Sequence, residues 1–433
     1  ASFVEDYNSL SGTGGATDTQ LTVWSTTGRD QATILNDLIR STYTPNSKLT
    51  AGKTVGVNLQ IVQADAILPS VAAGNGPDVL MHAGMQLPIN YATRKAAVDL
   101  KTVADAADFE KVTARFRESA LTPLSFNGGV YGLPEQETYP VMFYRTDILS
   151  ELGIPAPSLD NPWTWEDVIK YLPVLQKKNM SFLMDTGTSV GADVSVGMTT
   201  FAMFVYQRGG QYYTEARDAT AFDSEAALDA FRQWTDLYKN YSLPVQYSFY
   251  QRFRLGDMPM GVENYTMATM LQVAAPEIDG LWDMAPLPGI TRPDGTVCNT
   301  AIAGGMSTIM LRSAKNKAAG WQLIKWLSGE EAQAAVGIEL EALLGPSGRF
   351  NPANRAAFDN LPWNKTEAAA IRAQWQTVTF LPQVPGGYYV DRNLTNAFRR
   401  TVFYNRNYRE ALLEYNREIQ LEITRKRREF GLD

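Results

Sequence analysis

The chain has 433 residues, of which 45% are hydrophobic and 20% are charged, an ordinary composition for a globular protein. This length exceeds what one hydrophobic core usually supports, so we expect two or three domains. The net charge of −7 argues against a nucleic-acid-binding protein, and no apolar run is long enough to span a membrane. Cys298 is the only cysteine and His82 the only histidine, which excludes an internal disulfide and a zinc site of the usual Cys/His type.

The N-terminus carries none of the signals of a freshly translated exported protein. It begins Ala-Ser-Phe-Val, without an initiator methionine, a basic and apolar signal segment, or an anchoring cysteine. We therefore expect a mature or trimmed chain. Residues 1–20, and residues 8–19 above all, predict a flexible polar leader. A tether to something upstream and a cloning boundary both account for it.

The first hundred residues predict strands and helices in alternation. Residues 21–25, 55–62 and 78–82 have the β-branched or alternating pattern of strands. A helix with one apolar face follows the first strand, and Thr27 or Asp30 is placed to cap it. This order of elements indicates an α/β fold with a parallel sheet.

Capping residues predict where later helices begin. Thr164 with Asp167 has the spacing of a capping box, and so does Ser328 with Glu331. Asp223 or Ser224 opens another helix. Ser313 is expected to start the helix that carries Trp321.

The C-terminal helix is predicted over residues 408–423, where apolar residues recur every three or four positions. Residues 425–428 (Arg-Lys-Arg-Arg) are the only dense basic run. Such a run suits nucleic acid or an anionic membrane. A helix end is the favoured interpretation, because cations are stabilised at the negative end of the helix dipole.

The most informative segment is 128–168. It joins a glycine-rich turn, Gly-Leu-Pro, a polar and aromatic loop, a strand, a short helix, Pro-rich coil and a new helix start. This order resembles the hinge-crossing segment of the bacterial family 1 extracellular solute-binding proteins, which feed sugars to ABC importers. The matching residues are Gly128, Tyr131, Gly132, Leu133, Pro134, Tyr144, Arg145, Asp147, Leu149, Gly153, Ile154, Pro155, Thr164 and Trp165.

Further segments resemble the same family in order along the chain: 67–84, 201–211, 253–260, 345–352 and 380–391. In the last segment the chain departs from the family, because Leu381 stands where a basic residue is usual and Tyr388 fills the aromatic position.

The resemblance implies an α/β, two-lobed periplasmic-binding-protein-like fold with an interlobe hinge and a ligand cleft. It places the N-terminal lobe at 21–133 with 261–309, and the C-terminal lobe at 139–259 with 311–433. Hinge crossovers are expected near 134–138, 260 and 310.

The aromatic content of 11% suits a sugar site, because sugar rings stack on aromatic planes while polar side chains bind their hydroxyls. Several predicted loops combine both residue types, and the resemblance adds two glycines at the cleft wall. The candidate ligand-binding residues are Trp24, Thr26, Arg29, Glu137, Tyr139, Tyr206, Gln207, Glu263, Asn264, Tyr265, Gly304, Gly305, Arg349, Tyr388 and Arg392.

Carboxylates leave an enzymatic alternative open. Glu135, Glu137 and Glu263 offer the paired carboxylates that a secreted glycosidase or polysaccharide lyase needs. Beside a sugar cleft they serve equally as hydrogen-bond acceptors, and we favour that role. A sugar-sensing module that does not interact with any permease is a third possibility. His82, at the end of a strand, is expected to be a structural histidine, with a cleft-facing position as the alternative.

The sequence therefore predicts the substrate-binding component of an ABC importer, which captures an oligosaccharide and delivers it to membrane permease subunits. We expect no catalytic residue, no cofactor, no metal and no nucleic-acid partner, and a monomer. Its expected place is the extracellular face of a bacterial membrane or the periplasm, with a lipid anchor in the full-length protein. Arg349 and Arg392 allow an acidic sugar, because guanidinium binds carboxylate in a bidentate manner.

Overall fold

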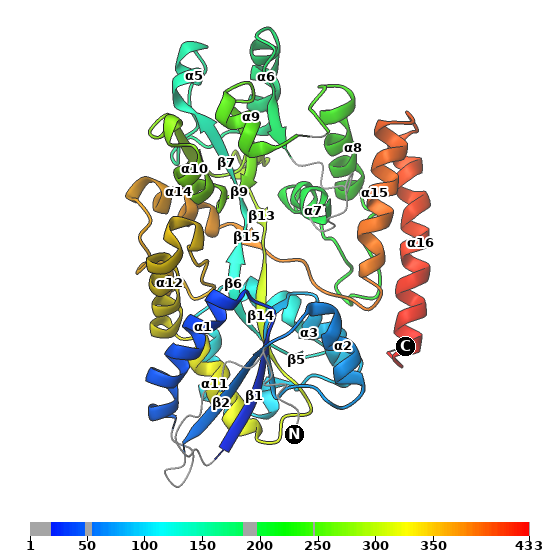
Figure 1. Ribbon diagram of the computed structural model, residues 1–433. Helices are drawn as coiled ribbons and strands as arrows, with labels where there is room; N and C mark the ends of the chain where they lie inside the picture. The colour runs from blue at the N-terminus through cyan, green and yellow to red at the C-terminus, as the bar shows by residue number, and fades with distance from the viewer. Residues whose placement is uncertain (1–18, 48–53, 185–196, 246, 433) are drawn as a thin grey trace. The chain divides into compact units, whose positions relative to one another are not determined.

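The computed structural model describes residues 19–47, 54–184, 197–245 and 247–432 (Figure 1). Two compact units are present. Unit 1 comprises Ala1–Glu137 and Gly304–Pro362, and unit 2 comprises Thr138–Ala303 and Trp363–Asp433. The chain passes from one unit to the other three times. Most of the predicted leader lies outside the described residues.

Unit 1 is built on a five-stranded sheet of order β2-β1-β3-β14-β6. Its strands are β1 (Thr19–Ser25), β2 (Val55–Ile61), β3 (Val79–Gly84), β6 (Leu133–Thr138) and β14 (Gly304–Met310). Strand β1 pairs in parallel with both β2 and β3, which confirms the predicted parallel α/β arrangement. Strand β14 is antiparallel to β3.

Helices of unit 1 pack against this sheet through a continuous apolar core. Ile67, Leu80 and Ile309 are almost fully buried in one cluster. The helices are α1 (Arg29–Leu38, continued by a π-helical turn, Ile39–Tyr43), α2 (Ala64–Ala72), α3 (Leu87–Thr93), α4 (Ala106–Thr113), α11 (Lys317–Leu327), α12 (Glu330–Leu344) and α13 (Arg355–Phe358).

Unit 2 contains a four-stranded sheet of order β10-β7-β9-β8. Its strands are β7 (Pro140–Arg145), β8 (Phe182–Met184), β9 (Met260–Asn264) and β10 (Trp282–Ala285). Strand β7 is antiparallel to both β9 and β10, and β8 is parallel to β9.

The helices of unit 2 surround this sheet and continue to the C-terminus (Figure 1). They are α5 (Thr146–Glu151), α6 (Trp165–Gln176), α7 (Gly197–Gln207), α8 (Glu225–Lys239), α9 (Phe249–Leu255), α10 (Met267–Ala274), α14 (Lys365–Trp375), α15 (Tyr388–Val402) and α16 (Tyr408–Glu429). None of the helices in the described residues is long and apolar enough to cross a membrane.

Two of the three predicted crossovers are wrong. The first division falls at Glu137–Thr138, inside the range 134–138, but the others fall at Ala303–Gly304 and Pro362–Trp363. Strand β9 does not cross at residue 260, because it pairs on both sides with strands of unit 2. After residue 310 the chain stays in unit 1 through α11, α12 and α13.

Two predicted helix caps are confirmed. The Thr164 hydroxyl accepts from the Asp167 N–H, and the Asp167 carboxylate accepts from the Thr164 N–H, which completes the capping box of α6. Ser224 accepts from the Ala227 N–H at the start of α8.

Other predicted caps are wrong because the side chains have partners elsewhere. The Ser313 hydroxyl donates to the carbonyl of Pro77, and α11 is capped by Asn316 instead. The Ser328 hydroxyl donates to the carbonyl of Lys325 and accepts from the Arg115 guanidinium, so α12 begins after Gly329 without a side-chain cap.

The cap predicted for α1 at Thr27 or Asp30 is also wrong. This helix follows Gly28 and has no side-chain cap, while Thr27 donates to the side chain of Gln31. Asp30 lies in the first turn.

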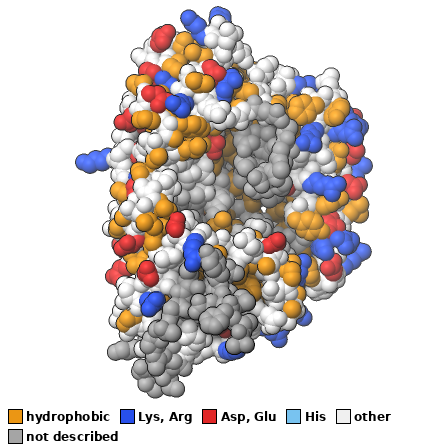
Figure 2. Space-filling model, in the orientation of Figure 1, with side chains coloured by type: hydrophobic (Ala, Val, Ile, Leu, Met, Phe, Trp, Pro, Cys, Tyr) orange, Lys and Arg blue, Asp and Glu red, His pale blue; other side chains and the backbone are white. Residues whose placement is uncertain are grey.

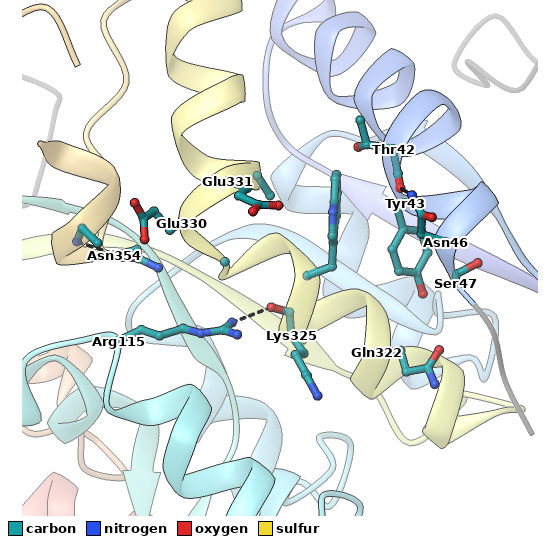
Figure 3. A pocket seen from close by; sticks show the side chains of 14 residues that line it. Thr42, Tyr43, Asn46, Ser47, Arg115, Gln322, Lys325, Glu330, Glu331 and Asn354 are labelled. Atoms are coloured by element: carbon teal, nitrogen blue, oxygen red, sulfur yellow. Dashed lines mark hydrogen bonds between the residues drawn. The ribbon is translucent and has the colours of Figure 1, made fainter. Parts of the chain in front are cut away.

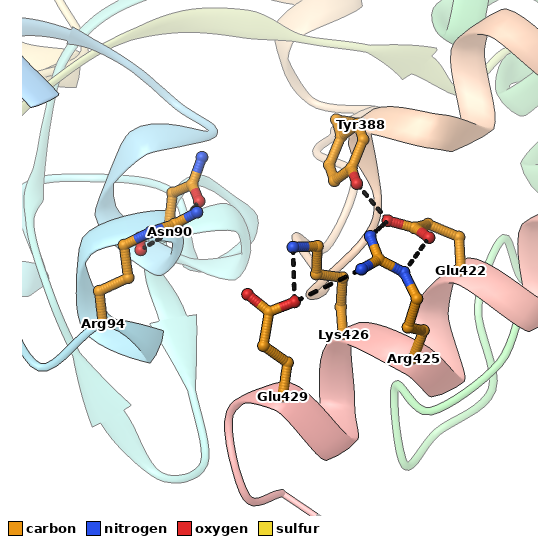
Figure 4. A network of polar contacts seen from close by, with 7 residues as sticks. All are labelled: Asn90, Arg94, Tyr388, Glu422, Arg425, Lys426 and Glu429. Atoms are coloured by element: carbon orange, nitrogen blue, oxygen red, sulfur yellow. Dashed lines mark hydrogen bonds and ion pairs between the residues drawn. The ribbon is translucent and has the colours of Figure 1, made fainter.

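The predicted C-terminal helix is confirmed as α16, which packs along α15. Arg425 pairs with Glu422 at 2.6 Å and Lys426 with Glu429 at 2.7 Å (Figure 4). Hydrogen bonding to Arg425 lowers the pKa of Glu422 to about 2. On the face drawn in Figure 2, basic side chains gather along α15 and α16 together with acidic ones. These pairs support the helix-end interpretation of the basic run.

Candidate functional site

One edge of the unit 1 sheet collects the ends of several strands. Because β1, β2 and β3 are parallel, their carboxyl ends lie at the same edge, and the antiparallel β14 begins there at Gly304. Strand β6 is the neighbour of β14, and a Cβ on Gly305 would lie 1.9 Å from the carbonyl oxygen of Gln136. The last residues of β6 therefore reach this edge too. Edges of this kind bind ligands in open α/β sheets.

The structure brings six of the predicted residues to the carboxyl edge of unit 1. The Trp24 indole donates to Gln60 at 2.9 Å, and the Thr26 hydroxyl donates to the carbonyl of His82 at 2.9 Å. Arg29 is exposed on the first turn of α1. The others are Glu137 at the end of β6 and Gly304 and Gly305 at the start of β14.

His82 is the centre of a polar cluster at this edge. Its backbone has a φ of 52°, and its N–H donates to Oε2 of Glu135 at 2.8 Å. Nδ1 lies 3.1 Å from Oε1 of the same carboxylate, and Nε2 lies 2.9 Å from Nε2 of Gln136. Glu135 thus holds both the backbone and the ring of the strained residue.

The electrostatics of the cluster raise the pKa of His82. Burial by itself lowers the pKa of His82, but attraction and hydrogen bonding from the Glu135 carboxylate together raise it above its ordinary value. Sequence reasoning named both residues and did not connect them, and it missed Gln136. No local signal in the sequence connects these residues, because β3 and β6 come into one sheet only in the folded structure.

Glu137 is the most deeply buried of the predicted acids. It is 1% exposed, and its backbone N–H donates to the carbonyl of Asn351 at 3.1 Å. This position ties the end of β6 to the segment that follows α12. Glu137 is also the last residue of unit 1 before the first crossing.

The unit 2 sheet gathers a second group at one edge. Strand β7 begins where the antiparallel strands β9 and β10 end. Tyr139 precedes β7, and Glu263, Asn264 and Tyr265 lie at the end of β9, with the Tyr265 N–H donating to the Tyr139 carbonyl at 3.1 Å. The four predicted residues are therefore neighbours.

Aromatic packing dominates this edge of unit 2. The rings of Tyr139 and Tyr265 are 4.8 Å apart, and the Tyr139 hydroxyl donates to the carbonyl of Ile371 at 3.0 Å. Trp375 lies 6.2 Å from Tyr139, and Trp363 lies 5.8 Å from Tyr265. Sequence reasoning missed both tryptophans, because they come from the last part of the chain and reach the edge only through the third crossing.

The two polar residues on β9 shape the turn into α10. An oxygen of Glu263 accepts from the Asn264 N–H at 2.8 Å, and the Asn264 side chain accepts from the Thr266 N–H at 3.1 Å. Both side chains are half-buried. The two side chains therefore stabilise the backbone between β9 and α10.

A match to the family described as bacterial extracellular solute-binding protein spans residues 48–334. The chain belongs to this family. A relative from Brucella abortus (strain 2308), whose name describes a putative binding protein, is 22% identical over 379 residues, which are 83% of this chain and 84% of the relative.

Solved structures of solute-binding proteins share the fold. The sugar-binding protein MalE from Xanthomonas citri has a TM-score of 0.76 at 20% identity and covers 96% of this chain and 100% of its own. The cyclic α-maltosyl-1,6-maltose binding protein from Arthrobacter globiformis has a TM-score of 0.74 at 16% identity, with 94% and 99% coverage. A Thermotoga lettingae protein bound with α-D-tagatose has a TM-score of 0.67 at 18% identity, with 94% and 100% coverage. The two-lobed α/β fold of periplasmic binding proteins is thereby confirmed.

Two further candidates of this solute-binding protein lie at the end of α7. The amide of Gln207 is completely buried and bonds the Trp165 indole and the carbonyls of Pro288 and Thr300. Tyr206 is half-buried, and burial raises its pKa. Gln207 thus links α7 to α6 and to the loops beyond β10.

The remaining candidates have their partners on helices. The Arg349 side chain, in unit 1, is 6% exposed and forms a bidentate pair with Glu341, at 2.9 and 2.5 Å. Tyr388 and Arg392 lie on α15, where Tyr388 is exposed and bonds Glu422 of α16 (Figure 4). Arg392 is exposed and lies over the Tyr389 ring.

The described residues hold no group of three or more His, Cys, Asp or Glu side chains that suits a metal ion. Among the carboxylates of the enzymatic alternative, Glu135 is engaged with His82, and Glu263 belongs to the other unit from Glu135 and Glu137. Cys298 is a buried free thiol.

Proposed function

We propose that the chain is the substrate-binding component of an ABC importer, which captures an oligosaccharide or related sugar and delivers it to a membrane permease. The observation that carries this proposal is that each unit gathers predicted ligand groups at one edge of its sheet. Binding is coupled to closure of the hinge. Solved proteins of the same fold that bind maltose-type sugars or tagatose support the choice of sugar.

The two edges have complementary roles in this proposal. Unit 1 supplies polar groups: Thr26, Arg29, Glu137 and the backbone of Gly304 and Gly305 bind hydroxyls. Glycine suits position 304 because no Cβ bars a ligand from the backbone N–H groups, while the Cβ direction of Gly305 faces the carbonyl of Gln136.

Unit 2 supplies the acceptors Glu263 and Asn264, and the predicted stacking contacts of Tyr139 and Tyr265, each 2% exposed, require that this edge opens. Sugars need both kinds of contact. The other predicted contacts stay predictions: Trp24, Tyr206, Gln207, Arg349, Tyr388 and Arg392.

We propose further that the protein performs no reaction on its ligand and acts as a monomer. A lipid anchor that holds the full-length protein at the extracellular face of the membrane also stays a prediction.

A thermal-shift screen tests the sugar assignment. Neutral and acidic monosaccharides and oligosaccharides, with maltose, mannobiose and tagatose among them, are added to the full chain. A sugar that binds only the native state at about 100 times its Kd adds about 2.7 kcal/mol to the free energy of unfolding. If no sugar raises the melting temperature, the proposal fails.

Matched variants then locate the contact. Glu137→Gln at the unit 1 edge is expected to weaken binding of the sugar found in the screen by about tenfold, because a charged acceptor is lost. Glu339→Gln, on an exposed part of α12, is the control and leaves the Kd unchanged. Recovery of shortened or unsaturated sugar after incubation would favour the enzymatic alternative instead.

A further inference from the structure

Unit 1 contains a cavity that none of the predicted sugar-binding residues lines. Its volume is about 620 Å³, within the range of small-molecule pockets. One wall is the turn after α1, with Thr42, Tyr43, Asn46 and Ser47. The opposite walls come from α11, from the start of α12 and from Arg115 and Asn354 (Figure 3).

Two aromatic side chains line this cavity. The rings of Tyr43 and Trp326 are 5.3 Å apart and tilted by 44°. Trp326 is half-buried, and Tyr43 is 4% exposed. A flat indole at the side of a wet cavity is suited to stack on the apolar face of a sugar ring.

The Tyr43 hydroxyl is an unexplained polar group in this wall. It is buried and has no hydrogen-bond partner among the described residues. Buried hydroxyls are normally satisfied, because desolvation without a partner costs free energy. Because this oxygen has almost no accessible surface, a ligand in the cavity reaches it only if the Tyr43 side chain moves.

Charged groups around the cavity are balanced in sign. Glu330 and Glu331 lie in the first turn of α12, and Arg115 and Lys325 supply two positive charges. In Figure 3 the carboxylate of Glu331 and the guanidinium of Arg115 point toward the middle of the cavity. The balance favours a neutral ligand with both donors and acceptors over an anion or a cation.

Arg115 is held in place as a donor. Its Nη1 donates to the carbonyl of Lys325 at 2.7 Å and to the Ser328 hydroxyl at 3.0 Å. A guanidinium has five N–H groups, so donors remain for a ligand. Lys325 is paired with Asp108 at 2.6 Å, which is not one of the lining residues.

A smaller cavity lies on the other side of Trp326. It has a volume of about 30 Å³, and Trp326 and Ala332 line it together with His82 and Glu135. That space matches about one water molecule. A sugar therefore fits only the larger cavity, and Trp326 separates it from the polar cluster at the sheet edge.

We propose that the larger cavity is a second ligand site, which binds a neutral polyhydroxylated molecule the size of one or two sugar units. Trp326 stacks on the ligand, Glu331 and Glu330 accept from its hydroxyls, and Arg115 donates to them. The site rests on the cavity of unit 1 alone and not on the proposed transport function.

Indole NMR of the full chain tests this site. The chain has nine tryptophans, and a Trp326→Phe variant assigns the Trp326 signal. The probes are D-glucose, D-mannose and maltose. Each is titrated to a concentration many times higher than about 1 mM, so that even a weak site with a Kd of about 1 mM is saturated. At least one probe is expected to shift the Trp326 signal with saturation.

Two exposed acids of the same helix provide the matched variants. Glu331→Gln is expected to weaken the binding that moves the Trp326 signal by about tenfold. Glu339→Gln is the control, because Glu339 is equally exposed on α12 and does not line the cavity. Both substitutions keep the size of the side chain, so folding is expected to be preserved.

The outcomes separate this site from the transport function. If Trp326 shifts while Trp363 and Trp375 of unit 2 stay fixed, the second site stands whatever happens to the sugar-import proposal. If none of the three probes moves Trp326, or if Glu331→Gln and Glu339→Gln change the binding equally, the proposed site is wrong. A shift of the unit 2 tryptophans alone supports only the import proposal.

Discussion

The sheet edges of the two units achieve rigidity by different means. At the unit 1 edge a polar network fixes the backbone: Glu135 binds the N–H and the ring of His82, and Gly305 lies against Gln136. At the unit 2 edge, packed rings such as Tyr139 and Tyr265 fill the space. The unit 1 edge is therefore expected to lose stability when its backbone geometry changes. The unit 2 edge is expected to lose stability when side-chain contacts or hydrogen bonds are removed.

The largest expected effect is at the unit 1 edge. Gly305→Ala would place a Cβ 1.9 Å from the carbonyl oxygen of Gln136, so the backbone of β14 or β6 must move. We expect a loss of about 4 kcal/mol in the free energy of unfolding. Urea unfolding gives the loss, and hydrogen exchange is expected to rise in the peptides of β3, β6 and β14.

Gly304→Ala is the matched control for this substitution. A Cβ on Gly304 meets nothing within 4 Å, and the residue does not require a positive φ. It is expected to change the free energy of unfolding by less than about 0.5 kcal/mol. Equal losses in the two variants would show that close approach to Gln136 does not control this edge.

A smaller effect is expected at the unit 2 edge. Tyr139→Phe keeps the ring and removes only the hydroxyl that donates to the carbonyl of Ile371 at 3.0 Å. We expect a loss of about 1.5 kcal/mol, because a buried hydrogen bond is lost. The loss is measured by urea unfolding, with hydrogen exchange of α14 as the local readout.

Hydrogen exchange in the Tyr139→Phe variant shows which unit the substitution affects. If exchange in β3 and β14 of unit 1 rises as much as in α14, the effect is global and does not report on the aromatic edge. Unchanged stability would mean that ring packing with Tyr265 and Trp375 holds this edge without the hydrogen bond.

Local patterns in the sequence predicted the elements but not all their partners. The strand patterns near residues 21, 55 and 78 and the capping box at Thr164 depend on neighbouring residues, and the structure confirms them. The crossover near residue 260 was wrong, because β9 is defined by its pairing with β7 and β8. Such pairings are not encoded locally.

The site residues likewise divide into those that local sequence predicts and contacts that only the folded chain creates. Sequence reasoning named Glu135 and His82 separately, but their bonding depends on the arrangement of β3 and β6 in one sheet. The hydroxyls of Ser313 and Ser328 have cap spacing, yet distant groups compete for them. Trp363 and Trp375 were missed because the third crossing brings them to the edge.

The smallest expected effect depends on pH and concerns the polar network itself. Attraction to Glu135 outweighs burial and raises the pKa of His82 in the folded chain above the ordinary value of 6.5. A raised pKa means that protonation of His82 stabilises the folded state. This contribution is complete below pH 6.5 and is lost as the pH rises through the folded pKa.

His82→Gln isolates this contribution, because every other titrating group is shared with the parent chain. The stability advantage of the parent chain over the variant is expected to be about 1 kcal/mol larger at about pH 5.5 than at about pH 8.5, because protonated His82 is attracted to Glu135. As His82 is the only histidine, one ring-proton NMR signal reports its pKa directly. A measured pKa below 6.5, or a stability difference that does not change with pH, would mean that Glu135 serves the His82 backbone N–H alone. The unit 1 edge would then be held by strand geometry without the ion pair.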